Sequence, residues 1–470
     1  MNLRLSYYTI FSDPVNEKND RVCYSTLLGK TNIVSEYCYE CLVNNFIDEI
    51  PEEIIADLIA KKILVEESSN ELELAKVIQE NKASIESANM LSEIIRPSAM
   101  CQLGCYYCGQ KHTKDYLSDS LVDKICIRIE NKLASKKFKG LAVSWFGAEP
   151  LMGLKQMRLI SKRLKSFCLE RGLKYKGKVV TNGLSLKPNI FKELATELNV
   201  TGIEITLDGT KEFHDDHRYM KKGGGSFDLI LKNLVNITNL ENFKDLGCNI
   251  SVRCNVDEKN PEGVLPLIKL LKEKGLDDKI SYFYPVGIYS WAGNDAQKKS
   301  LTKEGFAKRE LEWMIDSITH GLDTSISIPQ RRKIVCMSVA NDAEMVDAFG
   351  NVFNCTEVSY TDFYENTPHV LGNLKQNAFA EFKDPPLKDW NDKVLQGKFP
   401  CSTCRLLPVC GGRCPKSWEE GLEACPPFKY NIRERLKLLY ITEKTSGQEK
   451  ENATEQFLRD IDSKEFTRVT

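Results

Sequence analysis

Cys101, Cys105 and Cys108 stand close together in the stretch CQLGCYYC, with three residues in the first gap and two in the second. Clustered thiolates of this kind are ligands for zinc or for iron–sulfur centres. A structural zinc site takes four ligands, so zinc would need a further residue, and the nearest histidine is His112. Three thiolates can instead bind three irons of a [4Fe–4S] cube and leave its fourth iron open for a substrate or cofactor. Gly104 would let the loop turn tightly.

Seven further cysteines gather toward the end of the chain, where regular periodicity fades. The first two stand on either side of Gly350, and the other five crowd into residues 401–425. Seven thiols could form a pair of zinc sites or two iron–sulfur clusters. Single cysteines such as Cys126 and Cys168 lie inside apolar helical patterns, and we expect them to be small core residues. The seven are Cys336, Cys355, Cys401, Cys404, Cys410, Cys414 and Cys425.

The composition excludes several classes of partner. The 65 basic and 66 acidic residues give a formal net charge of −1, which provides no electrostatic footprint for a nucleic acid. No uninterrupted apolar run of about 18 residues occurs, so we expect no membrane span. The first residues lack the regions of a secretory signal. We therefore expect a cytoplasmic protein, whose 17 cysteines serve other purposes than disulfide bonds.

Regular secondary-structure elements must position the cysteine loop, and the sequence on both sides of it predicts such elements. Six strand-like segments alternate with amphipathic helical ones, a pattern that predicts a parallel α/β sheet, either doubly wound or curled as a partial barrel. Functional groups then gather at the carboxyl ends of the strands. CQLGCYYC, GAEP, TNG and LDG all fall there. The expected strands are 91–95, 141–147, 177–183, 202–209, 248–257 and 279–287.

The rest of the chain divides around this core. We expect an α+β domain over 1–90, the α/β core over 91–295, a cysteine-rich domain over 330–428 and a helical tail over 429–470. Within the tail, the polar residues 443–456 are expected to be a linker.

The CxxxCxxC loop after the first strand of a β/α domain, with an aromatic residue before its last cysteine, resembles the radical S-adenosylmethionine (SAM) enzymes. The resemblance implies a partial (β/α)6 TIM-like barrel. It also implies a [4Fe–4S] cluster whose open iron chelates SAM, and an electron transfer that releases a 5′-deoxyadenosyl radical. An external donor such as flavodoxin or ferredoxin would supply that electron.

Two further motifs agree with this family. WFGAEP is similar to its GGEP motif, with Ala148 in place of the second glycine, and EITLDGTKEFHDDHR is similar to its SLDG stretch, with threonine for serine. The resemblance implies that a backbone carbonyl and the Glu149 carboxylate bind the SAM ammonium. Thr206 would reach the ribose or carboxylate, Arg218 would clamp the carboxylate, and Tyr107 would lie against the adenine. Asp208 would be structural, and Asn255 is a further candidate for SAM. The SAM set is Tyr107, Gly147, Ala148, Glu149, Thr206, Arg218 and Asn255.

The seven later cysteines resemble the SPASM extension of peptide-modifying radical SAM enzymes, which carries two auxiliary [4Fe–4S] clusters. When the family's ligand scheme is applied to this chain, it assigns three cysteines to an inner cluster. Two of them come from the earlier half of the cysteine-rich segment, and Cys414 comes from the later half. Some relatives have a fourth cysteine soon after the first, and its absence here implies an open iron. The inner ligands would be Cys336, Cys355 and Cys414. The outer ligands would be Cys401, Cys404, Cys410 and Cys425.

Three functions follow as hypotheses. The first is a maturase that takes hydrogen from a ribosomally made precursor peptide and forms a thioether or carbon–carbon cross-link. In it the residues before 91 would resemble a winged-helix peptide-recognition element that adds the peptide as a strand. The second is an anaerobic sulfatase maturase that makes formylglycine. Such enzymes place aspartate directly after the cysteine at position 355, whereas Thr356 and Glu357 follow here. The third is a non-catalytic iron–sulfur or zinc protein, which would not need GAEP or LDG. No general base can be singled out.

Overall fold

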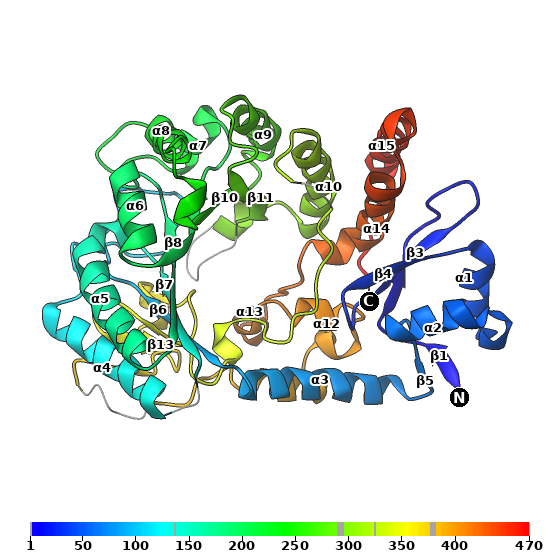
Figure 1. The fold of residues 1–470 in the computed structure, drawn as a ribbon, viewed down its shortest axis with the longest axis horizontal. Helices are drawn as coiled ribbons and strands as arrows, with labels where there is room; N and C mark the ends of the chain where they lie inside the picture. The colour runs from blue at the N-terminus through cyan, green and yellow to red at the C-terminus, as the bar shows by residue number, and fades with distance from the viewer. Residues whose placement is uncertain (1, 136–137, 289–295, 324–325, 377–381, 470) are drawn as a thin grey trace.

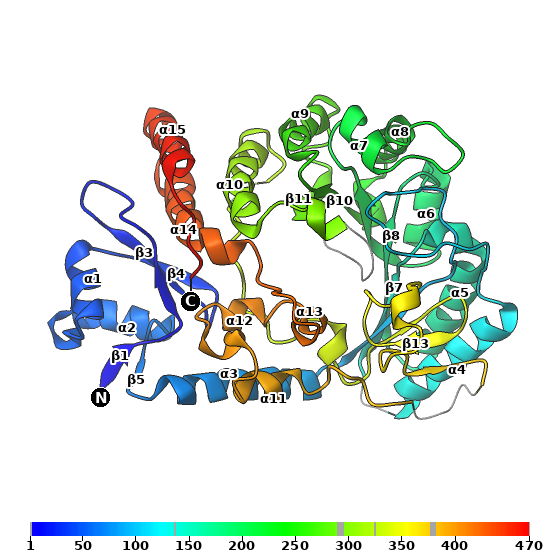
Figure 2. The same ribbon diagram turned by 180° about the vertical axis from the view of Figure 1, so that it is seen from behind.

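A computed structural model describes residues 2–135, 138–288, 296–323, 326–376 and 382–469. The boundaries expected at residues 1, 295 and 470 lie outside these ranges. Figure 1 shows a strand-and-helix barrel at one end of the molecule and a small N-terminal unit at the other. The long helix α3 (Asn70–Glu86) runs between them, and Figure 2 shows the same bridge from behind. No helix in these ranges has the length and apolar character of a membrane span.

The N-terminal unit consists of two small antiparallel sheets with two helices. In the three-stranded sheet, β3 lies between β2 and β4, while β1 pairs with β5. Cys23 on β3 packs toward the helices, whereas Val22 and Tyr24 pack against helix α14 (Phe428–Lys444) and the cysteine-rich segment. The sheet is therefore covered on both faces. The bounds are β1 (Leu3–Leu5), β2 (Thr9–Phe11), β3 (Arg21–Ser25), β4 (Lys30–Val34), α1 (Glu36–Val43), α2 (Glu52–Ala60) and β5 (Leu64–Glu66).

Six parallel strands form the barrel, in the chain order β6 to β11 across the sheet. All six predicted strands are present, and the partial-barrel prediction is confirmed. The strands are β6 (Met90–Ile95), β7 (Gly140–Trp145), β8 (Lys174–Thr181), β9 (Val200–Thr206), β10 (Asn249–Val256) and β11 (Ile280–Gly287). The helices are α4 (Asp119–Ser135), α5 (Leu154–Glu170), α6 (Pro188–Thr196), α7 (Lys211–His217), α8 (Phe227–Thr238), α9 (Val264–Glu273) and α10 (Lys303–Thr319).

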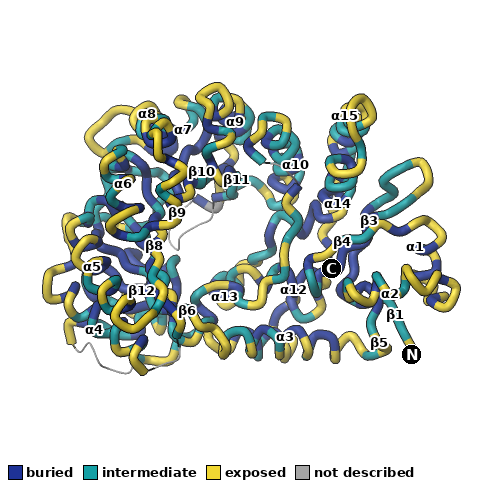
Figure 3. The backbone as a smooth tube through the Cα atoms, viewed as in Figure 1, coloured by how far each residue is buried: buried dark blue, intermediate teal, exposed yellow. Residues whose placement is uncertain are grey.

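The barrel core explains why these segments fold as they do. Alternating residues of the strands and one face of each helix form a single hydrophobic cluster, because each helix must bury its apolar stripe against the sheet. In α4 this stripe includes Ile125 and Cys126, and in α5 it includes Cys168. Both cysteines are buried core residues, as predicted. Figure 3 shows the buried strands surrounded by helices with exposed outer faces.

The cysteine-rich segment continues the barrel sheet. β12 (Glu344–Val346) pairs parallel with β6, and β13 (Asn351–Phe353) and β14 (Gly372–Asn373) extend the sheet antiparallel. A buried charge network fixes this junction. Lys132 of α4 contacts Glu93 of β6 at 2.7 Å and Glu344 of β12 at 2.8 Å, and Arg128 contacts Glu344 at 2.6 Å. These pairs hold the start of the cysteine-rich segment against the barrel.

Replacing Lys132 with methionine should lower the free energy of unfolding by about 2 kcal/mol, since two nearly buried carboxylates then lose their shared cation. The measurement is urea unfolding followed by tryptophan fluorescence. Lys155→Met is the matched control, because Lys155 pairs with Asp119 at 3.5 Å on an exposed surface and its loss should cost under about 0.5 kcal/mol. Equal destabilisation by the two variants would contradict the role given to the network.

The C-terminal helices correct one expectation. Residues 443–456 were expected to be a linker, but they span the end of α14 (Phe428–Lys444) and much of α15 (Gly447–Ser463). The reason is that α15 carries buried Phe457 and Ile461, which pack against α14. Shorter helices precede this pair, namely α11 (Trp390–Leu395), α12 (Leu407–Cys410) and α13 (Pro415–Glu419). Short 3₁₀ helices span Ile47–Glu49, Pro150–Gly153, Lys244–Leu246, Pro261–Gly263, Ala296–Lys299, Met337–Val339, Asp362–Tyr364 and Pro400–Thr403.

Candidate active site

The loop after β6 brings its three thiols together at the carboxyl end of the barrel. Cys101, Cys105 and Cys108 all line one cavity of about 600 Å³. Burial raises the pKa of Cys101 and of Cys105 to about 11, and the thiols are close enough to raise one another's pKa further. The N–H groups of Leu103 and Gln110 donate hydrogen bonds to Cys101 and Cys108. Such bonds stabilise sulfur as a thiolate ligand.

Gly104 serves this loop by close approach. A side chain at Gly104 would place its Cβ 2.6 Å from the ring of Tyr219, so only glycine fits without displacing that ring. The Gly104 N–H donates to the Tyr219 carbonyl at 3.0 Å. The loop therefore packs directly on the chain that follows α7.

The turn after β7 forms the next part of the cavity wall. Gly147 and Ala148 have φ angles of +85° and +45°, and both line the cavity. A left-handed alanine costs about 1–2 kcal/mol, so this turn holds Ala148 where glycine would be unstrained. Gln110 supports the turn, since its side-chain oxygen accepts the Ala148 N–H at 2.9 Å. Arg96 lies fully buried below it, and a Cβ on Gly147 would be 2.5 Å from the Arg96 side chain.

Glu149 lies behind the cavity wall. Its buried carboxylate accepts hydrogen bonds from the Thr181 hydroxyl at 2.7 Å and from the N–H groups of Asn182 at 2.7 Å and Leu151 at 3.0 Å. Burial raises the pKa of Glu149. Thr181 and Asn182 line the cavity, and Glu149 joins the ends of β7 and β8 beneath them. Its contact with the SAM ammonium stays a prediction.

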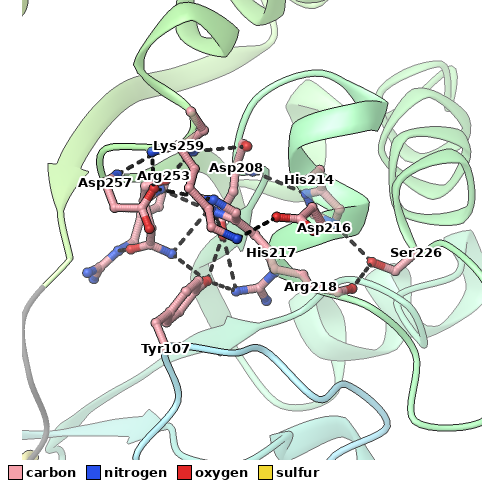
Figure 4. Close-up of polar contacts among 12 residues, drawn as sticks. Tyr107, Asp208, His214, Asp216, His217, Arg218, Ser226, Arg253, Asp257 and Lys259 are labelled. Carbon is pink, nitrogen blue, oxygen red and sulfur yellow. Dashed lines mark hydrogen bonds and ion pairs between the residues drawn. The ribbon is translucent and has the colours of Figure 1, made fainter. Parts of the chain in front are cut away.

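Tyr107 and Arg218 form the centre of a buried polar network, drawn in Figure 4. The Tyr107 hydroxyl accepts from Arg218 Nη1 at 2.6 Å and from Asn255 Nδ2 at 3.0 Å, and it donates to Asp208 Oδ2 at 2.6 Å. Burial alone would lower the pKa of Arg218, but Cys105, Tyr107 and Asp208 together raise it well above its usual value. Tyr107, Thr206, Arg218 and Asn255 line the cavity, and their contacts with SAM stay predictions.

His214 and His217 lie on α7, close to this network. Both are buried. His214 Nδ1 accepts the N–H of Asp208 at 3.1 Å, and its Nε2 lies 2.9 Å from the Ser226 hydroxyl. His217 Nε2 lies 3.4 Å from Asp257 Oδ1, and Figure 4 shows it beside the Tyr107 network. The two histidines therefore support that network from behind.

The far side of the same cavity belongs to the cysteine-rich segment. Cys414, Lys416 and Glu357 line it, opposite the first cysteine loop. Lys416 Nζ donates to the Tyr364 hydroxyl oxygen at 2.8 Å and to Glu420 at 2.9 Å. Burial raises the pKa of Glu357, and the nearby Lys416 opposes that shift. One cavity is thus lined by cysteines of both segments and by the carboxyl group of Glu357.

The expected inner ligands lie near one another. Cys336 and Cys414 each raise the pKa of Cys355, after the larger effect of burial. Cys414 likewise raises the pKa of Cys336. Arg96 reaches this region as well, since its Nη2 donates to the Thr356 carbonyl at 2.5 Å. The barrel turn and the Cys355 loop are therefore braced by one buried guanidinium.

The expected outer ligands line a separate, small and mostly apolar cavity. Around it lie Leu406, Trp418 and Lys429, and Lys429 hydrogen-bonds to the Cys404 thiol. Burial raises the pKa of Cys410 to about 12, and neighbouring thiols add to this effect. A dry pocket walled by four thiols suits a fully ligated cluster. The four thiols are Cys401, Cys404, Cys410 and Cys425.

All three thiol groups have chemistry that fits an iron–sulfur cluster. Apart from Cys336, which is exposed, these cysteines are partly or fully buried, and the first group has backbone N–H donors directed at sulfur. Within the described ranges, no group of three or more His, Cys, Asp or Glu side chains is arranged to hold a single metal ion. A four-iron cube holds its thiolates further apart than a single metal ion does. The absence of a single-ion site therefore does not bear on the cluster sites.

Several cavity residues were not predicted. Thr181 and Asn182 end β8, Glu204 lies on β9 and Arg253 on β10. The TNG sequence at the end of β8 marked the first two as strand-end residues, but gave them no role. Glu204 and Arg253 lie within strands, and the sequence alone does not show that their side chains face the cavity. No signal in the sequence marked Lys416, because its burial depends on a contact with Tyr364, which is 52 residues away in the chain.

Comparisons with known proteins found a family model and several similar chains. Residues 95–241 match the family model described as Radical SAM superfamily. The cysteine-type anaerobic sulfatase-maturating enzyme of Clostridium novyi (strain NT) is 24% identical over 386 residues, which cover 75% of this chain and 97% of that protein. The serine-type anaerobic sulfatase-maturating enzyme of Bacteroides thetaiotaomicron is 21% identical over 370 residues, which cover 70% and 84%.

Solved structures share the fold. Native anSMEcpe with bound AdoMet matches with a TM-score of 0.54 and 19% identity, covering 79% of this chain and 99% of that chain. Streptococcus suis SuiB bound to the precursor peptide SuiA matches with a TM-score of 0.45 and 16% identity, covering 90% and 98%. The first of these supports the fold assignment.

Proposed function

Because this chain contains a radical SAM domain, which implies a [4Fe–4S] cluster and SAM, we propose that it modifies a peptide by radical chemistry. When bound, the cluster and SAM would supply a carbon radical that takes a hydrogen atom from the substrate. Cys101, Cys105 and Cys108 would hold the cluster. Arg218 would hold the SAM carboxylate, and the turn at Gly147 would offer backbone carbonyls to the ammonium group.

The observation that carries the proposal is the cavity itself. It reaches from the first cysteine loop to Cys414 in one space of about 600 Å³. A substrate side chain in this space would face the SAM site on one side and the cysteine-rich segment on the other. Glu357 lines the same space, and burial favours its neutral form. We propose Glu357 as a group that exchanges a proton with the substrate.

We propose two auxiliary [4Fe–4S] clusters, which makes three clusters in total. The outer one would be fully ligated by the four thiols of the small cavity. The inner one would have three cysteine ligands, Cys336, Cys355 and Cys414, and hence one open iron. A flavodoxin or ferredoxin would be the external electron donor.

We also propose that the chain divides into the four domains expected from its sequence and acts in the cytoplasm.

In the N-terminal unit, β4 is an edge strand of the three-stranded sheet. An edge strand has unpaired backbone groups, so a precursor peptide could add to it as a further strand. This contact would keep the substrate near the enzyme while a later segment enters the cavity.

A cross-link and a formylglycine are the two candidate products. The two curated relatives are sulfatase-maturating enzymes, which favours formylglycine. Thr356 and Glu357 follow Cys355, whereas the sulfatase maturases as a family are expected to have an aspartate directly after that cysteine. About a quarter of this chain lies outside the match to the Clostridium relative. These differences favour a thioether or carbon–carbon cross-link.

Mass spectrometry of the product decides between them. Reconstituted protein should be incubated with SAM, a reductant and each short peptide encoded beside its gene. We expect a product that has lost two hydrogens, has kept its sulfur and does not react with a hydrazide. Formylglycine would react with the hydrazide, and its formation from cysteine would also remove the sulfur. An aldehyde product would contradict the cross-link, and unchanged peptides with well-loaded protein would contradict peptide maturation.

A further inference from the structure

A second and larger cavity, of about 950 Å³, lies beside the reaction cavity. The two share three lining residues, Tyr284, Val286 and Arg413, so they adjoin at this point. The second cavity lies between the barrel, through β11 and α10, and the segment around residues 326–335 with the start of α14. It therefore offers a substrate a route to the reacting centre from the side of α10.

Aromatic and apolar groups form part of its wall. Tyr282 and Tyr284 stack with their ring centroids 5.1 Å apart and their planes 25° from parallel. Tyr282 is 45% exposed, and Phe428 lines the opposite side. An exposed stacked pair is a platform on which an apolar or aromatic side chain of a ligand can pack.

The charged groups of the wall are mainly basic. Two of the five basic residues are used within the chain: Arg435 pairs with Glu310, and Arg331 donates to the Pro408 carbonyl and to Asn81. The other lining acid is Asp323, whose pKa burial raises to about 6. The basic residues are Arg331, Arg332, Lys333, Arg413 and Arg435.

Three of these cations make only weak side-chain contacts, or none, within the described part of the chain. Arg332 makes one long hydrogen bond, at 3.4 Å to the Val335 carbonyl, and Lys333 lies 3.9 Å from Glu80. The Arg413 side chain forms no hydrogen bond or ion pair with a described residue, and only its backbone N–H donates, to the Cys410 carbonyl at 3.2 Å. Its φ of +63° is a strained conformation for a non-glycine residue, and such strain is typical of functional positions. Arg413 also lies at the junction of the two cavities.

We propose that this second cavity binds an acidic segment of the substrate peptide, with carboxylates on Arg332, Lys333 and Arg413 and a neighbouring apolar side chain on the Tyr282 platform. The proposal rests on the peptide-modifying function above and adds a sequence requirement to it. Carboxylates flanking the reacting residue would be selected, while a basic segment would be repelled by the same cations.

Fluorescence anisotropy with labelled octapeptides tests this proposal on the reconstituted full chain, without reductant. The three probes are four repeats of glutamate–tyrosine, glutamine–tyrosine or lysine–tyrosine. We expect the glutamate peptide to bind about tenfold more tightly than the glutamine peptide and the lysine peptide to bind least, since several ion pairs of up to about 1 kcal/mol each separate them. Added salt should reduce the preference.

Variants locate the site. Arg332→Glu combined with Lys333→Glu should remove the preference for glutamate, and Arg413→Gln should weaken it about threefold. Tyr282→Ala should weaken all three peptides alike. The charge-matched control is Lys162→Glu with Lys187→Glu, two exposed lysines for which the structure shows no ion pair to a described residue. Melting temperatures and iron content show that each variant is folded and loaded.

The proposal would be overturned if the wild type bound the three peptides with equal affinity, or bound none of them at about 1 mM. It would also be overturned if the control variant lost the preference for glutamate as fully as the Arg332→Glu, Lys333→Glu variant. Because binding is measured without turnover, the outcome is separate from that of the proposed function. A retained glutamate preference without any peptide product would contradict the proposed function alone. A product formed without charge preference would contradict this inference alone.

Discussion

An Arg218→Gln variant is expected to bind SAM at least about 100-fold more weakly than the wild type, because it removes a buried cation from the cavity wall. Arg218 is 7% exposed and held by the Tyr107 hydroxyl at 2.6 Å. Its Nε has no protein partner within the described residues, which leaves a buried donor for a ligand. An uncharged glutamine would keep the side chain polar but would neither attract a carboxylate nor complement Asp208.

Equilibrium dialysis with radiolabelled SAM and oxidised, reconstituted protein measures this affinity. Two further variants separate charge from position. Arg218→Lys keeps the charge but loses the planar group, so it should fall between the wild type and Arg218→Gln. Tyr107→Phe leaves the charge and removes the hydroxyl that Arg218, Asn255 and Asp208 share, so about a tenfold loss is expected. Wild-type affinity in the Arg218→Gln variant, with full iron content, would contradict the assigned role.

The barrel could be predicted from sequence because its signals are local. Six apolar strand segments and the helical stripe of α4, including Ile125 and Cys126, have clear periodicity, and all are where they were expected. The first cysteine loop could be predicted for a similar reason, since the short spacing of Cys101, Cys105 and Cys108 places them in one loop. The grouping of the later cysteines comes from the family resemblance and stays a prediction. Predictions of this kind need only the order of elements and the rule that strand ends meet at one edge.

Residues whose role depends on distant contacts could not be predicted. Arg96 is an arginine at the end of a strand, and nothing in its neighbourhood indicates that it is fully buried and reaches the Thr356 carbonyl. His217 is likewise a polar residue that the sequence does not mark as buried, yet it lies buried beside Asp257. Glu149 was correctly placed at a strand end, but its bonds to Thr181 and Asn182 depend on how β8 lies beside β7. Each case combines residues separated widely in sequence.

A Cys105→Ala variant should lose the cleavage of SAM altogether, which is the largest effect we expect from any substitution in this chain. Cys105 lines the cavity with Cys101 and Cys108, and with only three thiols in the loop each one is needed to hold the cube. Cys126→Ala is the control, since Cys126 is a fully buried cysteine of the barrel core that belongs to none of the three groups of proposed cluster ligands. It should change stability slightly and leave the cluster intact.

The formation of 5′-deoxyadenosine from SAM, measured by chromatography under anaerobic reducing conditions together with iron content, tests the central claim most directly. The wild type and Cys126→Ala should contain about twelve irons per chain and form the product, whereas Cys105→Ala should keep about eight irons and form none above background. Product formation by Cys105→Ala at the wild-type rate would contradict the claim. So would well-loaded wild-type protein that forms no 5′-deoxyadenosine.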